Sequence, residues 1–255
     1  MFATKRDIAL AQLDAALAWG VRRHVVLADA GYGDSTEFRE ALAARGLQYV
    51  VAIPGTPYVW PPESSPSIPP KPTRTGRPRS KHTDPDHPAI SVKELSTMLT
   101  RRSVSWREGS RGWQSSRFAA VRVHTAHGYS KGAAPGEKQW LLCEWRDDGV
   151  AATKFYLSNL PPRTSLQTLV RLAKLRWRVE RDYQEMKQEI GLDHFEGRTW
   201  RGFHHHATLC AVAHAFLALR RALFPPEQSG LDAAAGEEGP AAGAAQLDRS
   251  LPALP

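Results

Sequence analysis

A strand–helix–strand pattern near the N-terminus limits the chain to a small set of folds. The apolar run His24–Ala28 is typical of a short buried strand, and Leu47–Gly55 is typical of a second one. Between them, Asp34 stands three residues before Glu37, as in a capping box, so we expect a helix from there to about Ala44. Such a unit has parallel strands joined by a right-handed crossover. The sequence therefore predicts an α/β fold.

The first predicted strand ends directly at Asp29. In open α/β sheets the functional crevice lies beyond the carboxyl ends of the strands. Gly31 and Gly33 allow the backbone to turn away there, which leaves the carboxylate facing the crevice. The alternative is a turn aspartate that bonds only nearby amides. Because neither a third glycine nor a P-loop lysine follows, the glycines do not indicate a nucleotide-binding loop.

The composition indicates a cytoplasmic globular protein. Apolar residues make up 42% of the 255 residues, enough for a sizeable core. The chain has no apolar run long enough for a membrane span, and "MFATKRDIALAQL" has no signal-peptide core. Cys143 and Cys210 stand far apart in apolar surroundings, so we expect reduced thiols rather than a disulfide or a zinc site.

Charge is distributed unevenly along the chain. Residues 227–255 hold five acidic residues and one basic residue, so the rest of the chain has 33 basic against 21 acidic side chains. A body with a net charge of +12 favours a polyanionic partner, most simply nucleic acid. The alternative is a soluble basic protein without such a partner.

Five segments follow from changes in composition. Residues 1–54 form the first part of the α/β core, and 55–89 a proline-rich basic linker in which no packed core is expected. Within this linker Arg77 and Arg79 belong to a basic run suited to a phosphate backbone, or to a merely solvated linker. Residues 90–152 are a β-rich insertion, 153–224 the second part of the core, and 225–255 a disordered tail.

The second part of the core should begin with a strand, Lys154–Ser158, that rejoins the main sheet. A long helix should follow, capped by Thr164 or Ser165 and running to about Ile190. One stripe of this helix is apolar, and we expect it to be buried: Leu172, Leu175, Val179, Tyr183, Met186 and Ile190. Another helix is expected over His205–Ala222.

Three charged residues lie along one edge of that apolar stripe. Arg176, Glu180 and Lys187 are spaced by four and seven residues, so they stack on one side of a continuous helix. Arg176 and Glu180 alone would be an ordinary i, i+4 ion pair. With Asp29 at a strand end, however, Glu180 would complete a pair of carboxylates among cations, which suits metal-assisted chemistry on phosphates. Periodicity leaves both interpretations open.

Two stretches resemble a known family. "AKLRWRVERDYQEMK" is similar to the Tyr-x2-Arg-x3-Glu-x6-Lys helix of bacterial insertion-sequence transposases, which have an RNase H-like core with an Asp-Asp-Glu site. "VVLADAGYGD" resembles the strand with the second aspartate of that site. The resemblance covers about residues 2–222. Ala173 replaces the tyrosine of the signature, and Tyr183 on a neighbouring face is a candidate substitute.

The resemblance implies a fold and an activity. The fold is a partial RNase H-like core, a mixed sheet with flanking helices, interrupted by the β-rich insertion. Asp29 and Glu180 are then the catalytic carboxylates and ligands of Mg²⁺ or Mn²⁺, two ions in the intact enzyme. Arg176 and Lys187 contact phosphate. The substrate is double-stranded DNA, namely the terminal repeats of a transposon and the target DNA. The resemblance also implies a bacterial protein associated with the nucleoid, and a homodimer is one arrangement of such a protein.

The family's first aspartate has no counterpart here. No strand ending in aspartate precedes Asp29, and Asp7 and Asp14 fall on or beside a predicted helix. We therefore expect a truncated chain that does not complete the metal site alone, which leaves its own enzymatic activity undecided. Two alternatives remain open: a non-catalytic DNA-binding remnant, and a metal-dependent nuclease.

The segment after the long helix holds the remaining candidates. His204, His205 and His206 point about 100° apart on a helix, so they do not chelate one ion together. Arg198 and Trp200 are candidate DNA contacts. A structural role in the loop is expected for three further polar residues: Asp193, His194 and Glu196.

Overall fold

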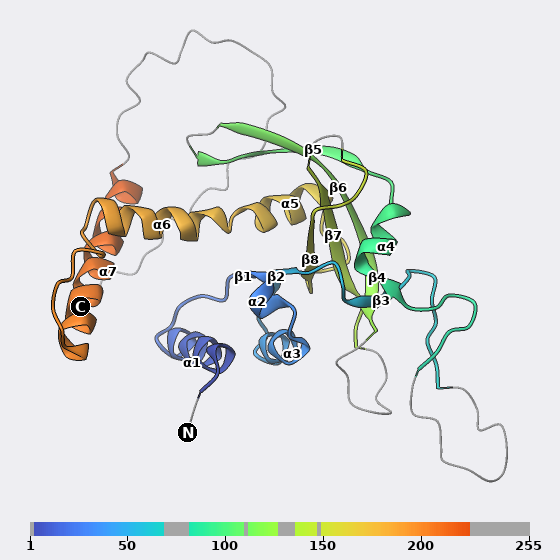
Figure 1. Cartoon of the computed structure of the whole chain (residues 1–255), viewed down its shortest axis with the longest axis horizontal. Coiled ribbons are helices and arrows are strands. Elements are labelled where there is room, and N and C mark those ends of the chain that lie inside the picture. The colour runs from blue at the N-terminus through green and yellow to red at the C-terminus, as the bar shows by residue number, and fades with distance from the viewer. Residues whose placement is uncertain (1–2, 69–81, 110–111, 127–135, 147–148, 225–255) are drawn as a thin grey trace, which may run out of the picture. The chain divides into compact units, whose positions relative to one another are not determined.

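The structure is a computed structural model that describes residues 3–68, 82–109, 112–126, 136–146 and 149–224. The chain divides into two compact units, Met1–Arg181 and Asp182–Pro255, which are described separately. The first unit is an α/β structure built on one sheet of eight strands (Figure 1). These strands are β1 Val26–Ala28, β2 Tyr49–Ile53, β3 Tyr58–Trp60, β4 Ile90–Ser91, β5 Arg102–Arg107, β6 Trp113–Thr125, β7 Gln139–Trp145 and β8 Lys154–Ser158.

Seven helices accompany the strands in the described residues. They are α1 Lys5–Ala18, α2 Ala30–Gly33, α3 Thr36–Ala44, α4 Val92–Thr97, α5 Leu166–Lys174, α6 Trp177–Gln188 and α7 Trp200–Leu223. None of the helices in the described part of the chain has the length and apolarity needed to span a lipid bilayer.

The sheet is mixed, as expected from the sequence. Its order is β1-β2-β8-β7-β6-β3-β4, and β5 pairs with β6 outside this path. β1 and β2 are parallel, with Val26 opposite Tyr49, and every other pairing is antiparallel. The predicted βαβ unit is confirmed, and β8 joins the sheet beside β2. Strands of the predicted insertion, β6 and β7, continue this same sheet.

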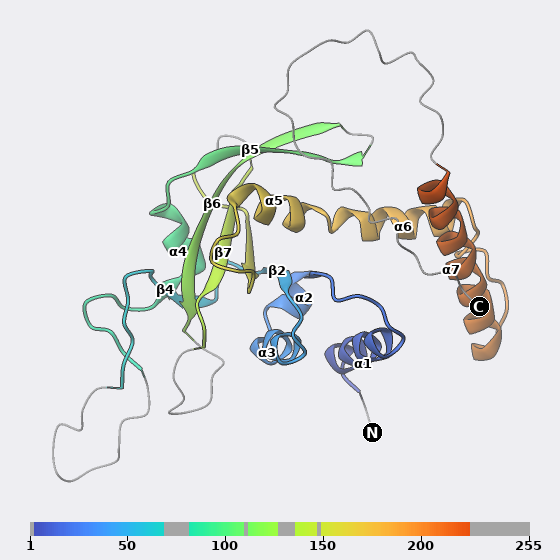
Figure 2. The ribbon, with the colours of Figure 1, turned by 180° about the vertical axis from the view of Figure 1, so that it is seen from behind.

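Helices cover both faces of the sheet. α1 and α3 lie on one face and α5 on the other, which both the front and back views show (Figures 1 and 2). Side chains of β7 alternate between the two resulting cores: Leu141 packs with the α3 side chain Leu42, whereas Leu142 packs with Leu169 of α5. Neighbouring residues of β1 do the same, because Ala28 packs against the core with Leu42 and Leu27 packs against the core with Leu169.

Helix α3 of the βαβ unit begins one residue later than predicted. Ser35 is the N-cap of α3, and its hydroxyl accepts a hydrogen bond from the Phe38 amide. Asp34 instead ends α2, a four-residue helix capped by Asp29. The prediction of Asp34 as the cap was wrong because a second short helix occupies the turn, which moves the start of α3 to the next side chain able to cap it.

Part of the proline-rich segment packs into the core, contrary to expectation. Val59 and Trp60 of β3 are 0% and 5% exposed. β3 pairs with the end of β6 and with β4, which supplies the backbone partners that a linker lacks. Arg77, Arg79 and the predicted tail 225–255 lie outside the described residues.

The predicted long helix is two helices. Ser165 caps α5 as expected, but α5 ends at Lys174 and α6 begins at Trp177. At the break, the amides of Arg178 and Val179 bond to carbonyls three residues back, a tighter winding than the α-helical one. The predicted burial of the apolar stripe is wrong for Val179 and Tyr183, which are 52% and 55% exposed, whereas Met186 and Ile190 are half-buried.

The second unit is the C-terminal part of α6 and the long helix α7. Arg221 of α7 pairs with Glu185 of α6 at 3.1 Å, and Cys210 Sγ lies 3.7 Å from the carbonyl of Ile190, just after α6. Cys210 and Cys143 are both free and buried, as predicted, and burial raises the pKa of Cys143 to about 12. Another stripe of α7 is exposed: Leu209, Val212, Phe216, Leu219 and Leu223.

Candidate functional site

A cavity of about 480 Å³ lies at the carboxyl end of β1, within the first unit. Asp29 borders it from the strand end and Glu180 from the first turn of α6. Three cationic side chains line the same cavity, namely Lys154, Lys174 and Arg176. The structure thus brings the two predicted carboxylates and Arg176 to one place, although they are far apart in the sequence.

Asp29 is held in place by the turn that follows it. Its Oδ1 accepts a hydrogen bond from the Gly31 amide at 3.0 Å, and the residue caps α2. Both interpretations of this aspartate are therefore observed together, because it bonds a nearby amide and also borders a cavity. Gly33 allows this turn to lie close to the sheet, since a Cβ atom there would be 2.1 Å from the Ala52 carbonyl oxygen.

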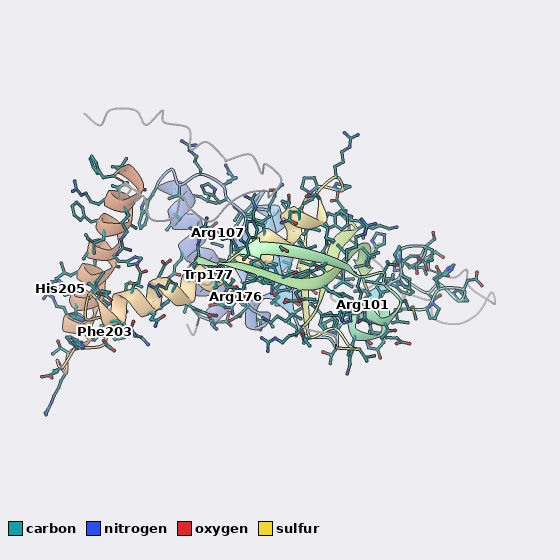
Figure 3. The ribbon with its side chains drawn as sticks, turned by 90° about the horizontal axis from the view of Figure 1, so that it is seen from above. Arg101, Arg107, Arg176, Trp177, Phe203 and His205 are labelled. Carbon is teal, nitrogen blue, oxygen red and sulfur yellow. The ribbon has the colours of Figure 1, made fainter. Side chains whose placement is uncertain are left out.

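Glu180 forms the i, i+4 ion pair that its spacing permits. Arg176 Nη2 lies 2.8 Å from Glu180 Oε1, and the two side chains are 41% and 66% exposed. An ion pair this exposed contributes little to stability, so Glu180 can exchange its partner for a ligand at small cost. Figure 3 labels Arg176 and Trp177 where α6 begins, with Arg107 at the end of β5. The β5–β6 hairpin contacts this point, because a Cβ atom at Gly109 would lie 2.7 Å from the Trp177 ring.

Lys174 and Glu144 are site residues that sequence reasoning missed. Lys174 Nζ lies 2.5 Å from Glu144 Oε1, and the two side chains are only 12% and 7% exposed. Burial lowers the pKa of Lys174, and Glu144 opposes that shift. A signal for this pair was present in the sequence: Glu144 interrupts the apolar strand "WLLCEW", and a buried acid in such a strand requires a partner.

Three other predicted DNA contacts belong to the second unit and remain predictions. Tyr183, Lys187 and Arg198 are all exposed there. None of these three lines the cavity at Asp29.

The histidine triplet is divided among different neighbours. His206 Nε2 lies 2.9 Å from the Gly191 carbonyl oxygen, and the His204 ring lies 4.1 Å from that of Trp200. His205 is exposed at the same end of α7 (Figure 3). Of Asp193, His194 and Glu196, the first two form a loose pair with 3.7 Å between Oδ1 and Nε2.

The donor set of the cavity suits a hard divalent cation. Asp29, Glu180 and a further lining residue, Glu108, offer carboxylate oxygens, which Mg²⁺ and Mn²⁺ prefer over sulfur or imidazole nitrogen. Within the described residues, however, no three or more His, Cys, Asp or Glu side chains are grouped closely enough to hold a metal ion. The cavity therefore has carboxylates that can bind a metal ion, but in the described residues they are not grouped as a complete coordination sphere.

A second hollow lies on the other side of Asp29. It has a volume of about 370 Å³ and shares Asp29 and Arg176 with the first cavity. Its remaining lining is mostly apolar, from α1, β1 and the start of α6. It lacks the two lysines and the two glutamates that line the first cavity.

One family model matches the N-terminal part of the chain, residues 1–113. No curated protein matches the chain. The family match includes β1, α2 and Asp29 but ends before the helix with Glu180. Residues 1–113 match the family described as the DDE superfamily endonuclease.

Proposed function

We propose that this chain belongs to a DDE-type transposase, which moves DNA by metal-dependent phosphoryl transfer at transposon ends. The observation that carries the proposal is the shared cavity, where Asp29 at a strand end and Glu180 on a helix face one space with three cationic side chains. The match to the DDE superfamily endonuclease family over residues 1–113 also supports the proposal. This support does not depend on Glu180, which lies outside the matched residues.

In this proposal Asp29 and Glu180 would hold Mg²⁺ or Mn²⁺. When bound, such ions lower the pKa of a water or hydroxyl nucleophile and stabilise the leaving oxygen of an in-line displacement. Arg176 holds Glu180 through its ion pair at 2.8 Å and faces the DNA phosphate. Water first attacks the phosphodiester at the transposon end, and the released 3′-hydroxyl then attacks the target strand.

The proposal also assigns the segments of the chain. Residues 1–54 and 153–224 form an RNase H-like core, 55–89 a proline-rich basic segment of which β3 packs into the sheet, 90–152 a β-rich segment inserted in the core sequence and 225–255 a tail. Pairing of β2 with β8 supports the division, because it joins the two core segments directly. Lys187, Tyr183, Arg198, Arg77 and Arg79 are assigned to the DNA-binding surface, with a homodimer as the acting form.

Manganese binding tests the two carboxylates directly. Electron paramagnetic resonance titration should show Mn²⁺ bound by the wild-type chain and much weaker binding by Asp29→Asn and by Glu180→Gln. The Asn side chain can still accept the Gly31 amide bond, so the α2 cap is retained. Asp14→Asn is a matched control, because Asp14 pairs with Arg45 and does not line the cavity. Unchanged Mn²⁺ affinity in both cavity variants would contradict the proposal.

A DNA assay separates transposase from nuclease. With Mg²⁺ or Mn²⁺ and a terminal-repeat duplex, a transposase nicks the repeat end and joins it to target DNA, whereas a metal-dependent nuclease cleaves without joining or end specificity. Because the family's first aspartate has no counterpart here, we expect little or no activity from this chain alone, and any cleavage or joining that it catalyses should disappear in Asp29→Asn.

A non-catalytic DNA-binding role is favoured by one observation, namely the absence of a group of three or more metal ligands among the described residues. Duplex binding that persists in a chelator and is unaffected by Glu180→Gln, together with no Mn²⁺ binding, would support that role instead.

A further inference from the structure

Lys174 has an unusual position for a lysine. It is the last residue of α5, its side chain is 12% exposed, and it lines the cavity that contains Asp29 and Glu180. Lysines are almost never buried this far unless they are paired. Its partner, Glu144, lies on β7 in the middle of the sheet, so the ion pair fixes the ammonium group against the sheet.

Two aromatic rings restrict the ammonium group further. Lys174 Nζ lies 4.5 Å from the centre of the Trp106 ring and 5.5 Å from that of Phe118. The two rings meet edge to face, with centres 5.8 Å apart. A cation over an aromatic face is attracted by the ring electrons, most strongly where water is excluded. The charge is therefore held at one point of the cavity wall.

Glu144 is not fully satisfied by this arrangement. Its Oε1 pairs with Lys174, but its Oε2 is buried and accepts no hydrogen bond in the described structure. Burial, and secondly the nearby Glu144 carboxylate, raise the pKa of Tyr156, which also lines the cavity. A buried ion pair with an unsatisfied oxygen is a poor device for stability, because an apolar pair of similar size is often as stable or more so. Binding of an anionic ligand would give the Lys174 ammonium group a role other than stabilising the fold.

The charges of the cavity indicate what that ligand is. Arg176 is paired with Glu180, and Lys154, opposite Glu144 on the neighbouring strand, is exposed. The Lys174 ammonium has three donors, and Glu144 is the carboxylate that pairs with it among the described residues. Its remaining donors suit an oxyanion that enters the cavity.

We propose that Lys174 is a phosphate-binding residue of this cavity, which contacts a non-bridging oxygen of the DNA strand beside Asp29 and Glu180, and that Glu144 is its positioning residue. This inference rests on the proposed function, since it takes the ligand to be a DNA phosphodiester. It assigns a fixed cation inside the cavity, in addition to the exposed basic residues on the surface.

The salt dependence of DNA binding tests the contact. Each phosphate contact that is lost reduces the slope of log Kd against log salt by about 0.9 for a duplex. The double variant Lys174→Met, Glu144→Gln removes the contact without changing the net charge and without leaving one buried charge unpaired. Fluorescence anisotropy with a short duplex oligonucleotide should show that decrease in slope.

Lys138→Met is the matched control. Lys138 is also partly buried, and its Nζ donates to the Pro62 carbonyl at 2.8 Å, but it does not line this cavity. Its variant should keep the wild-type slope. Lys174→Arg, which retains the charge and a donor for Glu144, should also keep that slope.

Thermal unfolding monitored by circular dichroism separates a binding role from a structural one. A structural role alone lowers the melting temperature and leaves the slope unchanged, and that result in a folded double variant would overturn the proposal. Should that double variant not fold, Lys174→Gln with Glu144→Gln, whose two amides can bond to each other without a buried charge, should show the same decrease in slope, and an unchanged slope there overturns the proposal equally. Failure of the proposed function is distinguishable, because it appears as Mn²⁺ binding that is independent of Asp29 and Glu180 in the wild-type Lys174 background.

Discussion

Two ion pairs lie within a few residues of each other and have opposite environments. Lys174–Glu144 joins α5 to β7 with side chains that are 12% and 7% exposed. Arg176–Glu180 lies just beyond, at the start of α6, with side chains that are 41% and 66% exposed. Both pairs border the same cavity through at least one member.

The difference separates two ways of placing charge at a site. A buried ion pair is rigid, and removal of one member leaves an uncompensated charge away from water. An exposed ion pair is adjustable, because water and salt replace either partner at little cost. We infer that the buried pair holds a cation at a constant position, while the exposed pair leaves the Glu180 carboxylate ready for a metal ion.

The largest effect should come from breaking the buried pair. Lys174→Met leaves Glu144 buried and unpaired, and we expect the free energy of unfolding to decrease by about 3–5 kcal/mol. Urea denaturation followed by circular dichroism measures it. Adding Glu144→Gln should restore most of the loss, because the remaining amide carries no charge. If the single and double variants are equally unstable, the pair is not the buried ionic contact described here.

The effect of burial on a polar side chain can also be tested through pH, at Tyr49. Burial raises the pKa of Tyr49 to about 12 from 10.0, and its hydroxyl donates to Gln139 Oε1 at 3.0 Å. Because the folded-state pKa is above the unfolded value, this contribution to stability is complete below pH 10 and is lost as the pH rises toward 12. At 1.36 kcal/mol for each unit, the loss is about 3 kcal/mol.

Urea denaturation of wild type and Tyr49→Phe at several pH values measures this loss. Between pH 10 and 12 the wild-type chain should lose that stability relative to the variant. At pH 7 the two should differ by a constant amount, which reflects the hydrogen bond and packing. Parallel curves across the alkaline range would mean that Tyr49 is accessible to water.

The smallest effect on stability should come from the exposed pair. Glu180→Gln removes one i, i+4 interaction, which is worth about 0.3–0.5 kcal/mol, so the urea midpoint should hardly move. Arg176→Met should behave in the same way. A loss of stability as large as that of Lys174→Met would show that Glu180 has a structural role, and it would weaken its assignment as a metal ligand.

Local patterns were sufficient for the βαβ unit and for the position of Asp29. The apolar runs around His24–Ala28 and Leu47–Gly55 become β1 and β2 in parallel register, because strand signals depend on neighbours in the sequence. The same reasoning failed at the helix break. A period of 3.6 residues predicts one continuous helix, but it does not reveal that the winding tightens at Arg176–Val179.

The site was predicted in outline and missed in detail. Convergence of Asp29 and Glu180 on one cavity was predicted, and the structure has both in its lining. Their catalytic roles remain proposals. Lys174 and Glu144 were missed because their pairing joins a helix to a strand of the sheet, a contact that neither periodicity nor spacing encodes.

The sequence alone determined the parallel strand pair, the carboxylate at the end of the first strand, and the i, i+4 spacing of Arg176 and Glu180, since each depends on residues close together in the chain. Only the tertiary structure decided that the β-rich segment continues the main sheet, that Val59 and Trp60 are buried, and that Lys174 meets Glu144 beneath the cavity. The physical reason is that burial and ion pairing depend on which distant segments pack together, and this packing is settled by the whole core rather than by any one stretch.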